Sequence, residues 1–194
     1  MKALLVVIGL AAVVGIYGCA TYNGLVGADE SVKQHWADVE GAYQRRADLI
    51  PNLVSTVKGY MAHEEKVLEA VTAARAQATQ VKLDVSKLSD PKAVEEFEKA
   101  QAQLSGAFGR LLATSERYPD LKANDNFKTL MSQLEGTENR INVERHKYNE
   151  SVQTYNTKVR SFPTSMVAGI GHFQAKVPFK ATTAGAEQAP KVQF

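Results

Sequence analysis

The chain has 194 residues, a formal net charge of +2 and a single cysteine. This length allows one ordinary domain plus a targeting segment, and the small, interleaved charge does not indicate a nucleic-acid partner. One cysteine excludes both an intrachain disulfide and a cysteine-based metal site.

Residues 1–18 have the pattern of a signal peptide or membrane anchor. Lys2 precedes an uninterrupted apolar run over residues 3–16, which is short for a membrane span of about 20 residues. Residues 16–19 then resemble a bacterial lipobox, which implies cleavage before Cys19 and lipid attachment to that residue. The alternative is an uncleaved membrane-spanning helix. Both interpretations predict a body that is tethered to the membrane outside the cytoplasm.

A tether at residues 19–28 is expected to join the anchor to the body, because Gly24 and Gly27 weaken a continuous helix. Apolar residues then recur at helical spacing from Val32 to Val71, in phase across Pro51. Proline kinks a helix without always ending it. The pattern therefore predicts one helix from about residue 29 to 83, bent at Pro51.

Asp90 followed by Pro91 is a strong signal for the start of a second helix. Its apolar stripe runs from residue 94 to 118, and Pro119 is expected to end it. Gly106 and Gly109 lie within it, which suggests that a neighbouring helix packs closely there.

A third helix is predicted to begin near Asn124 and Asp125, and its stripe continues to residue 162, before Pro163. Three such stripes predict an all-α fold: an elongated antiparallel bundle of three long helices over residues 29–173. Residues 164–173 are expected to form a short C-terminal helix, which either caps the bundle or exposes an apolar oligomer or membrane contact. Residues 174–194 are predicted to form a flexible tail.

The best polar cluster lies near Pro51 and contains Arg45, Arg46 and Asp48. Pro51 frees the carbonyl group of residue 47, and Asn52 is a candidate to satisfy nearby backbone groups. A structural network is one interpretation. The other is recognition of an anionic partner by the paired arginines, whose guanidinium groups bind carboxylates and phosphates in bidentate geometry.

A second polar cluster includes Glu138 and Arg140. Glu138 and Arg145 occupy stripe positions where apolar residues are expected, which suggests pairing with Arg45 or Arg46 across the bundle. Asn149 and Asn156 are seven residues apart on one helical face beside two tyrosines. Their pattern indicates register setting or a subunit contact, and the tyrosines are expected to pack in the core.

Catalytic patterns are incomplete. His63 and Glu64 begin like a zinc-protease helix motif, but Val67 stands where the second histidine is needed. The four histidines are scattered, and neither a glycine-rich phosphate loop nor a Gly-x-Ser-x-Gly turn is present. The sequence therefore predicts no catalytic residue, no metal site and no cofactor.

Several stretches together resemble the LemA family of bacterial membrane-anchored helical proteins. The stretches are Tyr22-Asn23-Gly24-Leu25-Val26, Gln44-Arg45-Arg46-Ala47-Asp48-Leu49-Ile50-Pro51-Asn52-Leu53-Val54, Tyr118-Pro119-Asp120-Leu121-Lys122, Leu134-Glu135-Gly136-Thr137-Glu138-Asn139-Arg140-Ile141, Tyr148-Asn149, Tyr155-Asn156 and Ser161-Phe162-Pro163. The resemblance implies one N-terminal anchor, an extracytoplasmic helical bundle and no established enzymatic activity. A lipobox cysteine departs from family members that have a plain spanning helix.

These features predict a non-enzymatic scaffold of the bacterial cell envelope, which forms homo-oligomers or holds a partner protein near the membrane. The alternative is a regulator or sensor of an envelope enzyme, or of an anionic cell-wall or lipid ligand, that acts through Arg45 and Arg46.

Overall fold

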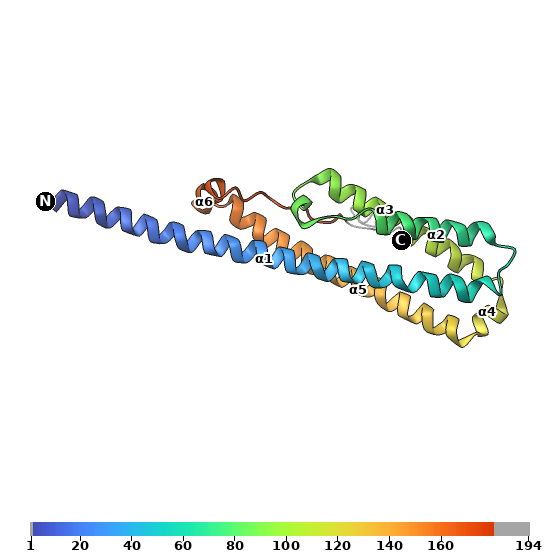
Figure 1. The fold of residues 1–194 in the computed structure, drawn as a ribbon. Helices are drawn as coiled ribbons and strands as arrows, with labels where there is room; N and C mark the ends of the chain where they lie inside the picture. The colour runs from blue at the N-terminus through green and yellow to red at the C-terminus, as the bar shows by residue number, and fades with distance from the viewer. Residues whose placement is uncertain (1, 181–194) are drawn as a thin grey trace, which may run out of the picture.

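The computed structural model describes residues 2–180. Its helices, in chain order, are α1 (Lys2–Lys58), α2 (Glu65–Gln80), the short 3₁₀ helix η1 (Val85–Lys87), α3 (Pro91–Ser115), α4 (Pro119–Ala123), α5 (Asp125–Arg160) and α6 (Thr164–Ile170). Figure 1 shows an elongated bundle in which α1 and α5 lie antiparallel, and α2 and α3 form a second antiparallel pair beside them. The predicted all-α class is confirmed.

The predicted single helix from residue 29 to 83 is wrong, because the chain reverses after Lys58. The amide groups of Tyr60 and Met61 both donate to the Val57 carbonyl, at 2.9 and 3.0 Å, and α2 then runs back along α1. The apolar stripe keeps its phase because both helices bury it in the same core, where Met61 joins Val57 and Val71. The bundle therefore has four long helices, and Pro51 lies inside α1 as predicted.

The apolar N-terminal segment and the bundle share one helix. The predicted tether at residues 19–28 is not a separate segment, because α1 continues through Gly24 and Gly27. Leu25 and Ala28 are already buried against the bundle, and this packing offsets the roughly 1 kcal/mol by which a glycine weakens a helix. An unburied 18-residue window of α1, with mean hydropathy 2.5, is long and apolar enough to cross a membrane.

The hydrophobic core has two parts. The part nearer the apolar segment is built around Trp36, whose ring contacts Phe97, Tyr148 and Phe179. The other part contains the buried leucines of the far end, Leu53 among them. Between the two parts, at the level of Arg46, α1, α3 and α5 contribute polar side chains and α2 contributes a backbone carbonyl.

The predicted helix starts are confirmed by their capping bonds. The Asp90 carboxylate accepts from the Lys92 amide at 2.9 Å, and the Asn124 side chain accepts from the Phe127 amide at 3.0 Å. The close approach expected at Gly106 and Gly109 is wrong. Both glycines are exposed, and a Cβ atom added at either would meet no atom within 4 Å.

Residues 173–180, named here the strap, pack against α5 in extended form. The prediction of a flexible tail is therefore wrong for residues 174–180. The Asn156 side chain exchanges two hydrogen bonds of 2.8 Å with the backbone of Lys176. Asn149 does the same with Phe179, at 3.0 and 2.8 Å. Seven helical residues and three extended residues both span about 10 Å, so the two spacings match. The remainder of the predicted tail lies outside the described residues.

Candidate functional site

A buried polar layer separates the two parts of the core and is centred on Arg46. Arg46 is only 3% exposed, and its guanidinium group donates to Glu138 at 2.7 Å, to the Ser105 hydroxyl at 2.8 Å and to the Gln101 side chain at 2.6 Å. The Gln101 amide in turn donates to the Ala78 carbonyl at 3.1 Å. The layer therefore joins all four long helices, and a slip of one helix by a turn would leave buried charge without a partner.

The structure brings together some of the predicted site residues and separates others. Arg46 and Glu138 pair across the bundle, which is one of the pairings predicted. Arg45 and Asp48 are exposed, and Asp48 accepts from Gln44 at 2.8 Å. Since consecutive helical residues point about 100° apart, Arg45 and Arg46 do not face one ligand together.

Arg140 and Asn52 do not join the polar layer. The Arg140 side chain is exposed and pairs with Glu144 along α5, at 2.6 Å. Asn52 is exposed as well, and its carbonyl accepts from Thr56 at 2.9 Å. Each of these contacts therefore lies within a single helix.

The carbonyl that Pro51 frees is satisfied from another helix. Proline at position 51 has no N–H to donate one turn back, so the Ala47 carbonyl loses its intrahelical partner. The Nε atom of Arg75, on α2, donates to that oxygen at 2.7 Å. This partner lies in a helix that the sequence pattern had merged with α1, and Asn52 does not fill the role.

A second buried arginine lies one layer nearer the apolar N-terminal segment. Arg145 pairs with Glu98 of α3 at 2.9 Å and donates to the Lys180 carbonyl at 2.8 Å and to the Tyr43 hydroxyl at 3.3 Å. Its guanidinium carbon lies 4.6 Å from the centre of the Phe179 ring. The expected pairing of Arg145 with Arg45 or Arg46 is wrong, and the role of Glu98 was missed because Glu98 lies outside the apolar stripe.

Arg46 and Arg145 line one groove between α3 and α5, named here the α3–α5 groove, with a volume of about 620 Å³. Its walls carry charges of both signs: Lys99, Lys180, Glu95, Glu98 and Glu138 also contribute. Burial raises the pKa of the Tyr43 hydroxyl, and the two neighbouring arginines partly oppose that rise. The groove therefore offers hydrogen-bond donors and acceptors in fixed positions.

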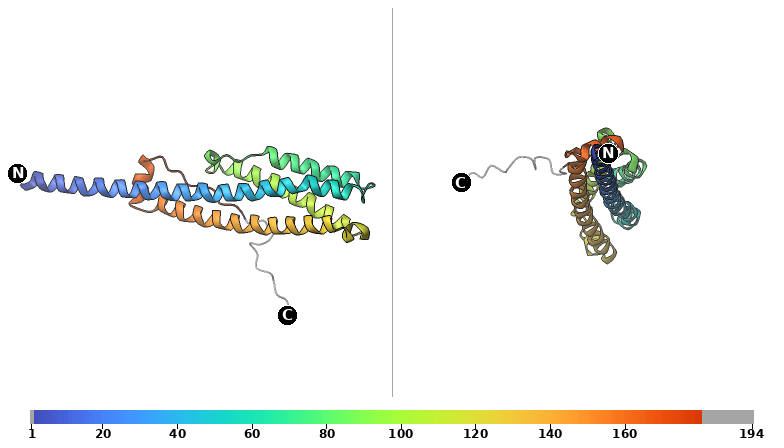
Figure 2. Two further views of the ribbon diagram at one scale, coloured as in Figure 1. Left: turned by 60° about the horizontal axis from the view of Figure 1, so that its bottom comes forward. Right: turned by 90° about the vertical axis from the view of Figure 1, so that its left-hand side faces the viewer.

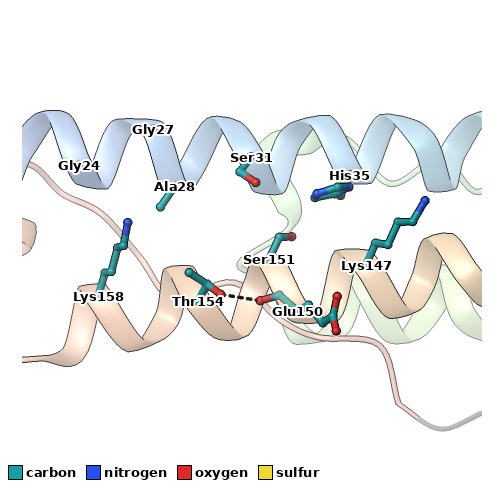
Figure 3. Close-up of a pocket in the computed structure, with 10 residues that line it drawn as sticks. All are labelled: Gly24, Gly27, Ala28, Ser31, His35, Lys147, Glu150, Ser151, Thr154 and Lys158. Atoms are coloured by element: carbon teal, nitrogen blue, oxygen red, sulfur yellow. Dashed lines mark hydrogen bonds between the residues drawn. The ribbon is translucent and has the colours of Figure 1, made fainter.

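Figure 3 shows a second groove, between α1 and α5, of about 480 Å³. Its α1 wall consists mainly of small residues, and its α5 wall holds Lys147 and Lys158. The Thr154 hydroxyl donates to the Glu150 backbone carbonyl rather than into the groove. Fewer fixed polar groups converge here than in the α3–α5 groove, so the latter is the better candidate site.

Neither a metal nor a lipid is assigned by geometry. Over residues 2–180, no group of three or more His, Cys, Asp or Glu side chains is placed to hold a metal ion. Cys19 is exposed on the apolar part of α1 as a free thiol. Lipidation at that position stays a prediction.

Comparisons with known proteins identify the family of this chain. The chain is 27% identical over 180 residues to the magnetosome protein MamQ of Magnetospirillum gryphiswaldense, and 26% to MamQ 2 of Paramagnetospirillum magneticum. Each alignment covers 84% of this chain and 66% of the relative, so the chain spans about two thirds of their length. The protein LemA of Metamycoplasma hominis is 23% identical over 75% of this chain and 63% of its own. The LemA family pattern matches residues 35–194, and the chain therefore belongs to the LemA family.

Proposed function

We propose that this protein is a membrane-tethered, non-enzymatic scaffold of the bacterial cell envelope, whose body lies outside the cytoplasm and holds a partner protein in the α3–α5 groove. The observation that carries the proposal is the continuity of α1, which links an exposed apolar segment to the bundle core without a break. A partner bound to the bundle is thereby held at a set distance from the membrane.

The chemistry of the α3–α5 groove favours a polypeptide partner. Arg46 and Arg145 are each already paired with a carboxylate, at 2.7 and 2.9 Å, so a lone anion would have to displace that partner. A polypeptide segment offers its own donors and acceptors to both signs of charge along the groove. A second copy of this chain satisfies the same chemistry and would make the protein a homo-oligomer.

Site-specific photo-crosslinking in intact cells tests the proposal. A photoreactive residue replaces Asn142, an exposed residue of the groove, and in a matched variant it replaces Gln153, an exposed residue of α5 outside the groove. We expect a discrete adduct from position 142 that is absent from position 153. Mass spectrometry of that adduct distinguishes a different protein from a second copy. No adduct, or the same adducts from both positions, contradicts the proposal.

A second candidate function is sensing of an anionic ligand. It is favoured by one observation: Arg46 Nε is buried and has no hydrogen-bond partner, although it lines the same groove as Arg145. Soluble glycerol phosphate is a suitable probe for cell-wall or lipid head-group chemistry. Sensing predicts a thermal shift on addition of the probe that declines with salt and is lost in Arg145→Gln. An unchanged melting temperature in the wild-type chain rejects this candidate.

A further inference from the structure

Three large apolar side chains project from the α6 region: Phe162, Met166 and Ile170, here named the end patch. They are 81%, 63% and 83% exposed. The spacing of four residues places Met166 and Ile170 on one side of α6, while Ala168 faces inward and is buried, and Phe162 lies just before the helix. Beyond the first 26 residues, the described chain exposes only two other large hydrophobic residues, Tyr60 and Val143. The end patch is therefore a local concentration of apolar surface.

The end patch lies where the membrane boundary is expected. Figures 1 and 2 show α6 at the end of the bundle from which the apolar start of α1 extends. A span of about 20 residues counted from Ala3 ends at Tyr22. The Tyr22 ring packs edge-on against Phe173, with ring centres 5.4 Å apart, directly after α6.

The alternative anchor leads to the same placement. A lipid on Cys19 would sit three residues before Tyr22, or about 4.5 Å along the helix. Cleavage at the lipobox and an uncleaved span therefore both bring α6 to the level of the bilayer surface.

The charge around the end patch complements an anionic surface. Residues 155–180 contain no aspartate or glutamate, while Lys158 and Arg160 are exposed at the end of α5. The first acidic residue of α1 is Asp29, and its carboxylate is engaged by Lys33 at 2.8 Å and by Lys176 at 3.2 Å. Apolar residues flanked by lysine and arginine are the pattern of a segment that lies in the membrane interface.

We propose that the end patch is a second membrane contact, which inserts into the interface of the bilayer beside the α1 anchor. The proposal rests on the membrane tether of the proposed function. A single helix leaves the bundle free to tilt and rotate, whereas a second contact off the α1 axis sets which face of the bundle points away from the lipid. The α3–α5 groove is then presented in one orientation.

Tryptophan fluorescence in reconstituted vesicles tests this contact. The full chain is placed in vesicles of equal parts phosphatidylcholine and phosphatidylglycerol, with and without brominated acyl chains that quench on contact. The native Trp36 is buried in the core, so the unmodified chain supplies the background. The test variants are Ile170→Trp and Met166→Trp. The matched control is Val143→Trp, at an exposed apolar position in the body of α5.

We expect brominated lipid to quench the added tryptophan at 170 and 166 by about twofold or more, as for a side chain in the acyl boundary, and to leave the control at background. Weaker quenching when phosphatidylglycerol is omitted supports the role of Lys158 and Arg160. The proposal is overturned if both test positions stay at background and are quenched by aqueous iodide. A second outcome also overturns the proposal: the added tryptophans are shielded from iodide but not quenched by brominated lipid, and the shielding increases with protein density. In that case a second copy of the chain covers the end patch. In both cases the chain remains in the vesicles, whereas failure of the tether itself leaves it in solution.

Discussion

The hydrogen bond between Arg75 and the Ala47 carbonyl exists because residue 51 is proline, and this dependence is measurable. Replacing Arg75 by Ala removes the donor and leaves a carbonyl of a buried residue without a partner. Replacing Pro51 by Ala restores an N–H at the position that donates one turn back, to the same oxygen. The two substitutions should therefore be coupled.

The expected magnitude follows from the bond. A hydrogen bond from a charged donor contributes about 1.5–3 kcal/mol to the free energy of unfolding, so Arg75→Ala should cost about that much in the wild-type chain. In a Pro51→Ala background the cost should fall to below about 1 kcal/mol, since the carbonyl keeps a partner. Lost side-chain packing of Arg75 is the same in both backgrounds and cancels from the difference.

Thermal unfolding of the four proteins, followed by circular dichroism, measures this cycle. A change of 1 kcal/mol shifts the melting temperature by about 2–4 °C in a domain of this size, so the single Arg75→Ala variant should melt roughly 3–12 °C lower. A cost of Arg75→Ala that is equal in both backgrounds, within about 0.5 kcal/mol, refutes the reasoning.

Three further predictions concern the polar layer, the strap and acid stability. Glu138→Leu should lower the free energy of unfolding by about 2–3 kcal/mol, because Arg46 stays buried without its carboxylate partner. Adding Arg46→Met should recover part of that loss. Chemical denaturation measures both variants, and additive effects of the two substitutions would contradict this prediction. Asn149→Ala with Asn156→Ala should remove four hydrogen bonds, lower the free energy of unfolding by about 2–4 kcal/mol and speed hydrogen exchange in the strap. Unchanged exchange there would refute the role of these asparagines in holding the strap. Burial tends to raise the pKa of Asp29, but its two lysine partners outweigh burial and lower that pKa. The stabilisation from Asp29 is therefore present above its unfolded pKa of about 3.9 and is lost as the pH falls through its folded pKa. In the Asp29→Asn variant, the free energy of unfolding should therefore fall less steeply as the pH is lowered. The same fall as in the wild-type chain would contradict the stabilising role of Asp29.

Local chemistry in the sequence predicted local structure well. Asp90 and Asn124 cap the helices they were expected to cap, since each bond depends only on residues two or three positions away. That Glu138 pairs with an arginine of the first helix was also predictable, because Glu138 interrupts an apolar stripe that must face that helix, and the structure selects Arg46 over Arg45. A buried charge needs a partner, and few residues were available to provide one.

The reversal after Lys58 was not predictable from periodicity. Two helices that fold back on each other bury the same stripe, so their spacing continues as if the helix were unbroken. Gly59 was a possible signal for the break, as a glycine commonly follows the end of a helix. Missing this reversal also hid Arg75 as the partner of Ala47.

The strap was missed for a different reason. It carries three large apolar residues, Phe173, Val177 and Phe179, but it contains Pro178 and is too short to show helical periodicity. Its order comes from the burial of Phe179 in the core and from Asn149 and Asn156, whose side chains supply the backbone hydrogen bonds that a neighbouring strand would otherwise make. The seven-residue spacing of these asparagines predicted a role in setting register or in a subunit contact. The segment that they hold is the strap of the same chain.

That α1 holds the bundle at the membrane outside the cytoplasm is tested most directly by protease accessibility in intact cells, followed by fractionation. Cells whose outer permeability barrier has been opened, but whose cytoplasmic membrane is sealed, are treated with protease, and the full chain is then followed in the membrane and soluble fractions. We predict that the chain stays with the membrane after alkaline carbonate extraction and that its bundle is digested while a cytoplasmic marker survives. Recovery of the intact chain in the soluble fraction, or protection of the bundle until the cytoplasmic membrane is broken, would contradict it.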